Sequence, residues 1–303
     1  MAITAQDVKN LREMTGCGMM DCKKALAASE GDMDKAIEWL REKGLAASAK
    51  KAGRIAAEGM AYACVVDGIG VAVEVNAETD FVGKNEKFVD FVKGVANTVA
   101  KCNPADLDAL MECKYDGTDL TVLQQQQEMV LVIGENIKVR RFARFEGGFS
   151  VPYIHAGGKI GVLVNLEVTG GIDATEIGKD MAMQIAALNP RFWDKSQVTQ
   201  DVLDEEKKIM LAQMANDPKM ASKPDQVKEK IVLGKLNKFY SENCLLQQAV
   251  VKDGDMTVEQ YMNSAAKTLG GTVKFLDAVR FEKGEGIEKK QENFAEEIAK
   301  LAK

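Results

Sequence analysis

A carboxylate and an aromatic ring stand side by side in a tetrapeptide formed by Thr79, Asp80, Phe81 and Val82. Valines alternate with other residues through positions 71–76, which is the period-two pattern of a half-buried strand. The positions that follow show the spacing of an amphipathic helix, with Phe88, Phe91, Val92, Val95 and Val99 on one face. Because such a junction lies at the surface on a rigid frame, the tetrapeptide is a candidate binding site.

Three roles are open to these residues. In the first, Phe81 offers a large rigid contact to a partner and Asp80 supplies a negative charge beside it. In the second, Asp80 caps the helix and Phe81 joins the core. In the third, Glu78 and Asp80 share one face of a strand as an acid–base pair, which requires a pocket that perturbs their pKa values. Turnover of a small molecule without a partner protein would favour this enzyme.

The remaining composition limits the chemistry further. The chain has a single histidine, His155, and six cysteines without any CxxC pair, so no ordinary zinc site is expected and the thiols are expected to be free. No nucleophile elbow and no phosphate-binding GxxxxGK[ST] loop occurs. We therefore expect no metal site, no cofactor and no enzymatic reaction.

The 303 residues carry a net charge of -6, which argues against direct binding to nucleic acid. Their hydrophobic fraction of 46% and charged fraction of 28% are those of an ordinary soluble protein of about two domains. No apolar run approaches the ~20 residues that span a membrane, and no signal region opens the chain. We expect no membrane partner and a cytoplasmic location.

Residues 1–44 read as a bundle of three short helices, of the size and shape of a ubiquitin-associated domain, with Gly44 ending the third helix. Met19 and Met20 follow a Gly-x-Gly turn, and neighbours on a helix point about 100° apart. At least one is therefore expected to be exposed as an adaptable binding surface, and the alternative is that both fill gaps in the core. Residues 45–59 read as a linker, or as a frayed helix.

From residue 60 onward the pattern is mixed α+β and repeats. A strand-like run at 69–73 is echoed at 160–164, and an Arg-Phe-Glu at 144–146 is echoed at 280–282. We expect two copies of an antiparallel sheet with helices on one face, in subdomains 60–148 and 149–284. The second copy is longer, and the insertion, about 190–236, is expected to form a helical hairpin. Residues 285–303 are expected to end in an amphipathic helix.

Three stretches together resemble one known family. TGCGMMDCKKAL near the N-terminus, ETDFV after the valine strand and VRFEKGEGIEK near the C-terminus are similar to bacterial elongation factor Ts. The resemblance covers nearly the whole chain. It implies a nucleotide exchange factor that binds the GTPase elongation factor Tu in its GDP-bound and nucleotide-free states. Such a factor makes and breaks no covalent bond, so it is not an enzyme.

The resemblance also assigns roles to residues. It implies that Thr79, Asp80, Phe81 and Val82 dislodge Mg²⁺ from the partner, so that GDP leaves and GTP can rebind. Further contacts are expected elsewhere in the chain, at Arg12, Met19, Met20, His155, Phe294 and Ile298. The hairpin can serve self-association as a homodimer in the family, and an arm packed on itself is the alternative. A competing hypothesis is a protein-interaction adaptor that uses only the bundle.

Overall fold

The computed structural model describes residues 3–221 and 223–288, and it confirms the predicted α+β class. The predicted C-terminal helix, including Phe294 and Ile298, lies outside these residues. The chain divides into two compact units, which we describe separately. Unit 1 comprises Met1–Arg144, Ile154–Gly161 and Phe281–Lys303, and unit 2 comprises Phe145–Tyr153 and Val162–Arg280.

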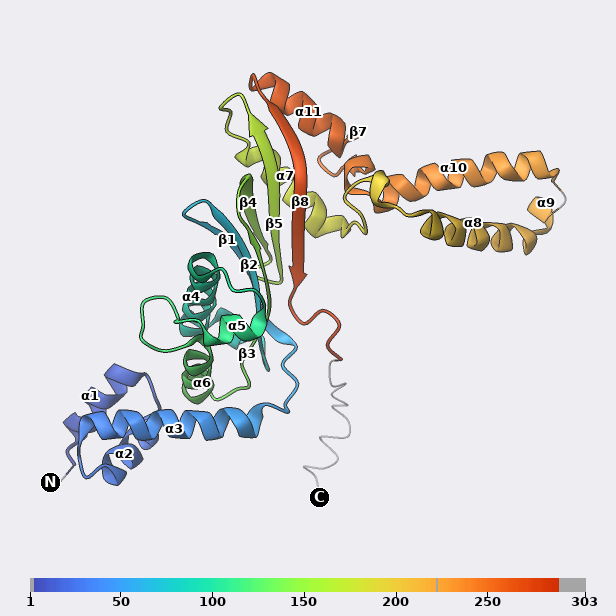
Figure 1. Ribbon diagram of the computed structural model, residues 1–303. Coiled ribbons are helices and arrows are strands. Elements are labelled where there is room, and N and C mark those ends of the chain that lie inside the picture. The colour runs from blue at the N-terminus through green and yellow to red at the C-terminus, as the bar shows by residue number, and fades with distance from the viewer. Residues whose placement is uncertain (1–2, 222, 289–303) are drawn as a thin grey trace. The chain divides into compact units, whose positions relative to one another are not determined.

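Unit 1 begins with three helices (Figure 1), α1 (Ala5–Thr15), α2 (Met19–Ala28) and α3 (Met33–Lys51). Thr4 and Asp7 form a capping box at the start of α1, and Gly16 ends it with a left-handed backbone. Leu11, Cys22 and Leu26 are fully buried between the helices. This small core holds the predicted bundle together.

The predicted end of the third helix at Gly44 is wrong, because α3 continues to Lys51. A side chain at Gly44 would place its Cβ 3.3 Å from the carbonyl oxygen of Gln127 in helix α6 (Val122–Ile133). This glycine therefore permits close packing of two helices, and it does not mark a stop signal. A glycine can serve either purpose, and only the neighbouring helix distinguishes them.

The rest of unit 1 is a three-stranded sheet with helices packed on it (Figure 1). The strand order is β1-β2-β3, and β1 pairs with β2 in antiparallel register with Met60 opposite Val75. Helix α4 packs against β1 and β2 and buries Phe88 and Phe91. The elements are β1 (Glu58–Val66), β2 (Ile69–Ala77), the 3₁₀ turn η1 (Val82–Lys84), α4 (Glu86–Cys102), α5 (Leu107–Glu112), α6 and β3 (Lys138–Phe145).

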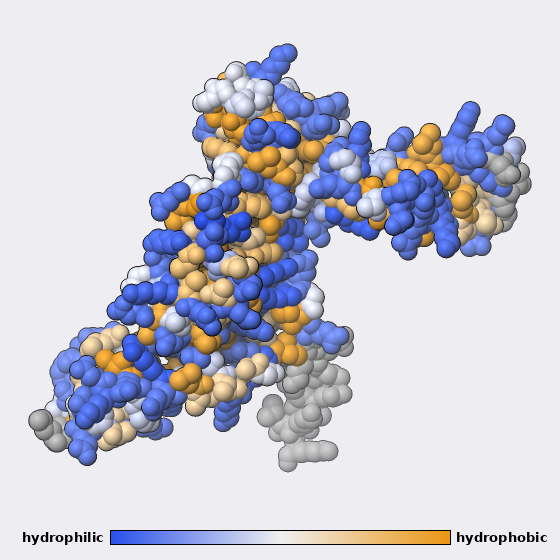
Figure 2. Space-filling view, in the orientation of Figure 1, coloured by the Kyte–Doolittle hydropathy of each residue, from blue (hydrophilic) through white to orange (hydrophobic). Residues whose placement is uncertain are grey.

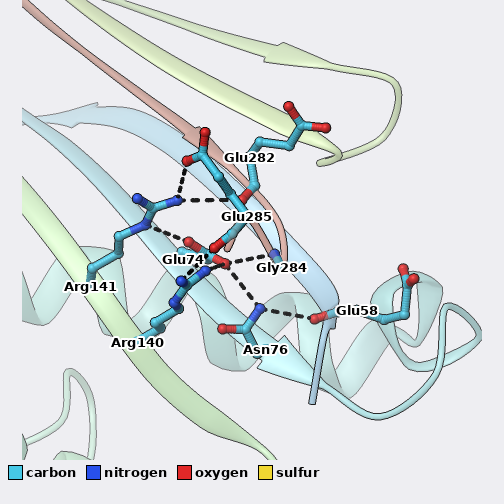
Figure 3. A network of polar contacts seen from close by, with 8 residues as sticks. All are labelled: Glu58, Glu74, Asn76, Arg140, Arg141, Glu282, Gly284 and Glu285. Atoms are coloured by element: carbon cyan, nitrogen blue, oxygen red, sulfur yellow. Dashed lines mark hydrogen bonds and ion pairs between the residues drawn. The ribbon is translucent and has the colours of Figure 1, made fainter. Parts of the chain in front are cut away.

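The prediction that the valine strand is half-buried is also wrong, since β2 is buried on both faces. Glu74 is fully buried on the second face, where its carboxylate accepts hydrogen bonds from Arg140 at 2.9 Å and Arg141 at 2.5 Å (Figure 3). The side chain of Asn76 and the backbone N–H of Gly284 donate to the same carboxylate, at 3.0 and 2.8 Å. Polar residues of an alternating pattern can therefore be buried when charged partners cover them.

The same network fastens residues 282–285 to the sheet. Arg140 donates to the backbone carbonyl of Glu285 at 2.5 Å, and Arg141 forms an ion pair with its carboxylate at 3.0 Å (Figure 3). The Arg141 guanidinium also lies 4.4 Å from the centre of the Phe281 ring. The buried Glu74 and its two arginines thus hold residues 282–285 against the sheet.

Unit 2 contains the second three-stranded sheet, in the order β4-β5-β8. Helix α7 packs closely on β4, because Gly178 lies directly against Val151. A two-stranded ribbon and α11 follow the hairpin. The elements are β4 (Phe149–His155), β5 (Ile160–Thr169), α7 (Thr175–Leu188), η2 (Lys195–Gln197), η3 (Leu245–Gln247), β6 (Ala249–Val250), β7 (Asp253–Thr257), α11 (Val258–Thr268) and β8 (Thr272–Glu282).

The predicted insertion is a helical hairpin of α8 (Gln200–Ala215), α9 (Pro218–Ala221) and α10 (Asp225–Asn243). Its second helix runs seven residues past the predicted end near 236 (243 minus 236). Met210, Met214 and Leu236 are buried in its seam. Figure 2 shows apolar side chains interspersed with hydrophilic ones along this hairpin, and Ile209 and Leu233 are among those exposed.

Candidate functional site

The turn between β2 and α4 carries the candidate tetrapeptide. The strand ends at Ala77, and Phe81 precedes the short turn η1. The Phe81 side chain is 81% exposed, and Asp80 is exposed beside it. The hypothesis that Asp80 caps the helix and Phe81 fills the core is therefore wrong. Asn85 caps α4 by accepting from the N–H of Lys87 at 3.0 Å, and Phe88 and Phe91 fill the core.

A clamp of hydrogen bonds holds the base of this turn. The carboxylate of Glu135 accepts from the backbone N–H groups of Glu78 and Thr79, both at 3.0 Å, and from the Thr79 hydroxyl at 2.6 Å. In return, the Glu78 carboxylate accepts from the backbone N–H of Asn136 at 2.6 Å and pairs with Arg54 at 3.4 Å. We call these five residues the turn clamp. It orders the backbone just before Asp80 and Phe81.

The far side of the turn is anchored by packing. Val82 is only 7% exposed and belongs to the core of unit 1, so it supports the turn from inside. Gly83 lies so close to β1 that an added Cβ would stand 2.7 Å from the carbonyl oxygen of Gly59. Phe81 and Asp80 are therefore the members of the tetrapeptide that reach solvent, between two fixed points.

The fixed backbone under Phe81 favours binding of its exposed ring to a partner. An exposed phenylalanine loses little conformational freedom on binding when its backbone is already ordered. More of the free energy gained by burying the ring therefore contributes to the affinity for the partner. Asp80 has no hydrogen bond or ion pair within the described part of the chain. Its charge is therefore available to an incoming partner.

The geometry does not support the hypothesis that Glu78 and Asp80 act as an acid–base pair, because Glu78 has other partners. Glu78 is occupied by Asn136 and Arg54, and it is half-buried while Asp80 is exposed. Within residues 3–221 and 223–288, no group of three or more His, Cys, Asp or Glu side chains is placed to hold a metal ion. Glu78 is thus part of the turn clamp, and Asp80 faces solvent without it.

A second candidate surface is a groove on the N-terminal bundle, with a volume of about 830 Å³. Met19 and Met20 line it and are 58% and 62% exposed, so the alternative that both fill core gaps is wrong. Arg12 contributes a positive charge to the lining. The other lining residues come from the same bundle and are Ile3, Thr4, Ala5, Val8, Lys9, Glu13 and Lys23.

His155 ends β4 and is exposed at the turn between β4 and β5. Its backbone carbonyl accepts from the N–H groups of Gly158 and Lys159, each at 3.1 Å. The carbonyl of Gly158 in turn accepts from the N–H of Ala61 in β1 at 2.8 Å. The turn with His155 is therefore fastened to the edge of the sheet of unit 1.

Sequence reasoning missed Arg54, Glu135 and Asn136 of the turn clamp. Glu135 follows the left-handed cap Gly134 at the end of α6, more than fifty positions from Thr79. An acid after a helix-ending glycine is an ordinary surface pattern. Nothing in the local sequence indicates that it binds a distant loop.

Glu135→Ala is expected to loosen the turn without unfolding the protein. It removes the acceptor for three hydrogen bonds, each with a net contribution of about 0.5–1.5 kcal/mol. Hydrogen exchange at the amides of Glu78 and Thr79 should accelerate by at least about tenfold. Glu259→Ala, which alters an exposed acid on α11, is the control and should leave both amides protected; equal protection in the two variants would contradict the clamp.

Comparison with known proteins agrees with the resemblance in the sequence. The family model for elongation factor TS matches residues 78–285. Proteins named elongation factor Ts are 50% identical in Clostridium perfringens (strain 13 / Type A), over 99% of both chains, and 46% identical in Syntrophotalea carbinolica, over the whole of both chains. Another, from Magnetococcus marinus, is 46% identical over 99% of both chains.

Among the described helices, none combines the length and apolar composition that crossing a bilayer requires. The family match spans well over half of the chain and includes the turn with Asp80 and Phe81. The relatives extend the similarity to the bundle that bears Met19 and Met20. The chain therefore belongs to the elongation factor Ts family of translation elongation factors.

Proposed function

We propose that this protein binds GDP-bound elongation factor Tu and promotes the release of GDP by inserting Phe81 and Asp80 beside the nucleotide site. The observation that carries the proposal is the 81% exposed ring of Phe81 on a turn held at both ends. An exposed aromatic on a rigid turn is costly to leave in water and is suited to a partner's pocket.

The metal ion is the weak point of such a nucleotide site. Mg²⁺ demands near-ideal octahedral geometry, so a small shift of its ligands is sufficient to lose it. The Phe81 ring can separate elements of the partner because it is large and rigid, while the charge of Asp80 disturbs the ligands or waters of the cation. Thr79 and Val82 hold this pair in position. Loss of the metal then weakens the hold on GDP.

The action is a binding exchange, and no covalent bond changes. By linkage, the factor by which this protein weakens GDP binding must equal the factor by which GDP weakens the binding of this protein. The direction of exchange is therefore set by the supply of GTP, which rebinds to the emptied site. For this reason we do not class the protein as an enzyme.

The groove of the N-terminal bundle is proposed as a second contact with elongation factor Tu. Its methionines are flexible and polarizable, so they adapt to an apolar helix face, and Arg12 suits an acidic residue on that helix. We assign partner binding to residues 1–44. Residues 45–59, which include the end of α3 and the first residues of β1, connect them to subdomains 60–148 and 149–284 and tail 285–303. His155 and the tail residues Phe294 and Ile298 complete the proposed contacts.

Three further features belong to the same proposal. A cytoplasmic location follows from the role in translation elongation, without direct contact to nucleic acid or membrane. The hairpin α8–α10 supplies a contact for a homodimer through exposed side chains such as Ile209 and Leu233. Its buried seam of Met210, Met214 and Leu236 explains equally how the hairpin persists as a monomeric arm.

The direct test is the release of a fluorescent GDP analogue from elongation factor Tu, with and without this protein. Release should accelerate strongly and saturate with protein concentration, and unchanged release would overturn the proposal. Deletion of residues 1–44 distinguishes the exchange-factor proposal from the adaptor hypothesis. The adaptor hypothesis is favoured by the groove of the bundle considered alone. Exchange predicts partial loss of partner binding, whereas an adaptor that uses only the bundle predicts complete loss.

Met19→Ser with Met20→Ser is expected to weaken binding while leaving the saturating release rate unchanged. Two apolar contacts are lost at the groove, each contributing about 1–2 kcal/mol because the side chains are already partly buried, so the half-saturating concentration should rise by roughly thirtyfold or more. The matched control is Met14→Ser, since Met14 is 64% exposed but lies outside the groove. A reduced saturating rate with unchanged half-saturation would contradict this role.

A further inference from the structure

The N-terminal bundle packs directly on helix α6, although the sequence predicts a linker after the bundle (Figure 1). Leu131 and Val132 of α6 are half-buried against the small apolar core of the bundle. Helices α3 and α6 approach closely, because a Cβ at Gly44 would stand 3.3 Å from the carbonyl oxygen of Gln127. The bundle is therefore docked on the rest of unit 1 as well as connected to it.

Two polar contacts join the bundle to the same part of unit 1. Arg41 of α3 donates to the carboxylate of Glu128 in α6 at 3.2 Å. The ammonium group of Lys87 donates at 3.3 Å to the carbonyl oxygen of Gly16, which ends α1, and a positive charge is favourable at a helix C-terminus. Lys87 lies in the first turn of α4, the helix that follows the Phe81 turn. Both α6 and α4 thus hold the bundle.

Helix α6 also leads to the turn clamp. Gln127, which faces Gly44, lies six positions before the end of α6 (133 minus 127), about 9 Å along the helix axis. Just beyond that end, the Glu135 carboxylate accepts from the backbone N–H of Thr79 at 3.0 Å. Arg54, three residues after the end of α3 (54 minus 51), is another member of the clamp. The same two helices therefore connect the bundle with the base of the turn.

We propose that Gly44 and the Arg41–Glu128 pair are positioning residues, which hold the methionine groove and the Phe81 turn at a fixed spacing so that both contact one partner molecule together. The inference rests on the proposed function, in which both surfaces bind the same GTPase. With the spacing fixed, contact at one surface places the other at a high effective concentration against the partner. Less conformational freedom is lost on binding than with a flexible connection.

Gly44 is the position that tests this arrangement most directly. A glycine inside a helix is less favourable for the helix than a larger residue, and Gly44 lies seven positions before the end of the 19-residue α3 (51 minus 44). The nearest atoms that a Cβ there would meet belong to Gln127 and Leu131 of α6. Gly44→Leu should therefore preserve α3 and displace the bundle from α6.

The first experiment needs no partner. Nitrogen-15 relaxation of the free, full-length protein compares the rotational correlation time of the amides in α1 and α2 with that of the amides in β2 and α4. The two times should be equal in the unaltered protein, because docked parts tumble together, and Gly44→Leu should shorten the time for α1 and α2 alone. Unequal times in the unaltered protein, or equal times in Gly44→Leu, would overturn the proposal.

The matched control is Gly53→Leu. A Cβ at Gly53 would meet no atom within 4 Å, so a leucine there enlarges a glycine near the end of the same helix without touching α6. The correlation times of this variant should equal those of the unaltered protein. Separate tumbling of the bundle in Gly53→Leu would attribute the effect to the connecting segment and would contradict the role of the contact between α3 and α6.

The second experiment measures release of a fluorescent GDP analogue from elongation factor Tu. Gly44→Leu should raise the half-saturating concentration by about tenfold or more and leave the saturating rate unchanged, because the Phe81 turn itself is intact. Gly53→Leu should change neither quantity. An unaltered half-saturating concentration in Gly44→Leu would overturn the positioning role. If the unaltered protein fails to stimulate release, the proposed function fails, whereas the relaxation experiment still decides whether the bundle is docked.

A charge exchange tests the ion pair. Arg41→Glu places two carboxylates together and should raise the half-saturating concentration by up to about fivefold, the factor expected for an exposed pair. Adding Glu128→Arg re-creates the pair with its charges reversed and should restore the original value. Failure of the double variant to recover would show that the two side chains act separately, which would contradict their positioning role.

Discussion

Replacement of Phe81 by alanine is expected to slow stimulated GDP release from elongation factor Tu by roughly tenfold to a hundredfold. The ring is exposed in the free protein, and its full burial against a partner contributes about 1.5–3 kcal/mol, which converts to this factor when it acts on the transition state. The saturating release rate, measured by stopped-flow fluorescence, is the quantity to compare. The melting temperature should remain unchanged, because Phe81 packs against little of its own chain.

Two other substitutions make this result specific. Val65→Ala alters an apolar side chain that is 40% exposed on β1, and it should leave release unchanged. Asp80→Asn keeps the shape of the side chain and removes its charge. A reduced release rate in this variant would therefore show the electrostatic effect of Asp80 separately from the steric effect of the Phe81 ring. If Phe81→Ala and Asp80→Asn both release GDP at the rate of the unaltered protein, the proposed mechanism fails.

Glu74→Ala is expected to be the most destabilising of these changes. Glu74 is fully buried and accepts from Arg140, Arg141, Asn76 and the N–H of Gly284 (Figure 3). Removing one side of a buried ion pair leaves uncompensated charge and costs about 3–5 kcal/mol. Urea unfolding measures the loss, and Glu259→Ala, at an exposed acid, should stay within about 0.5 kcal/mol of the unaltered protein.

The same network should also make stability depend on pH. Burial of the Glu74 carboxyl works to raise its pKa, but the hydrogen bonds from Gly284, Asn76, Arg140 and Arg141 together hold the pKa below its ordinary value of 4.5. A carboxyl with a lowered pKa in the folded state contributes its full stability above about pH 4.5 and loses it as the pH falls through the folded value.

The difference in unfolding free energy between the unaltered protein and Glu74→Gln should therefore be largest near neutral pH and narrow in acid. Glutamine keeps the size of the side chain but cannot ionise, so this comparison reports the charge. A difference that stays constant from neutral pH to acid would mean that the Glu74 charge does not stabilise the fold.

Local pattern was sufficient to predict the N-terminal bundle, the valine strand, the helix after it and the hairpin. Alternating valines predicted β2, and the spacing of Phe88, Phe91 and Val92 predicted α4, because each period follows from the geometry of one chain segment. The hairpin followed from the unequal length of the two copies. The errors fell where a residue's role depends on a distant neighbour, as at Gly44, which packs on α6 and does not end α3.

The sequence by itself determined the family, the order of elements and the proposal that Phe81 and Asp80 form a contact surface. Only the tertiary structure decided that Phe81 faces solvent while Val82 faces the core, that Glu135 clamps the turn, and that Glu74 is buried in a strand taken to be half-exposed. The physical reason is that helix and strand periods are local, whereas burial and charge pairing are set by segments far apart in the chain. Glu74 and Gly284 are 210 positions apart, yet their hydrogen bond decides the environment of both.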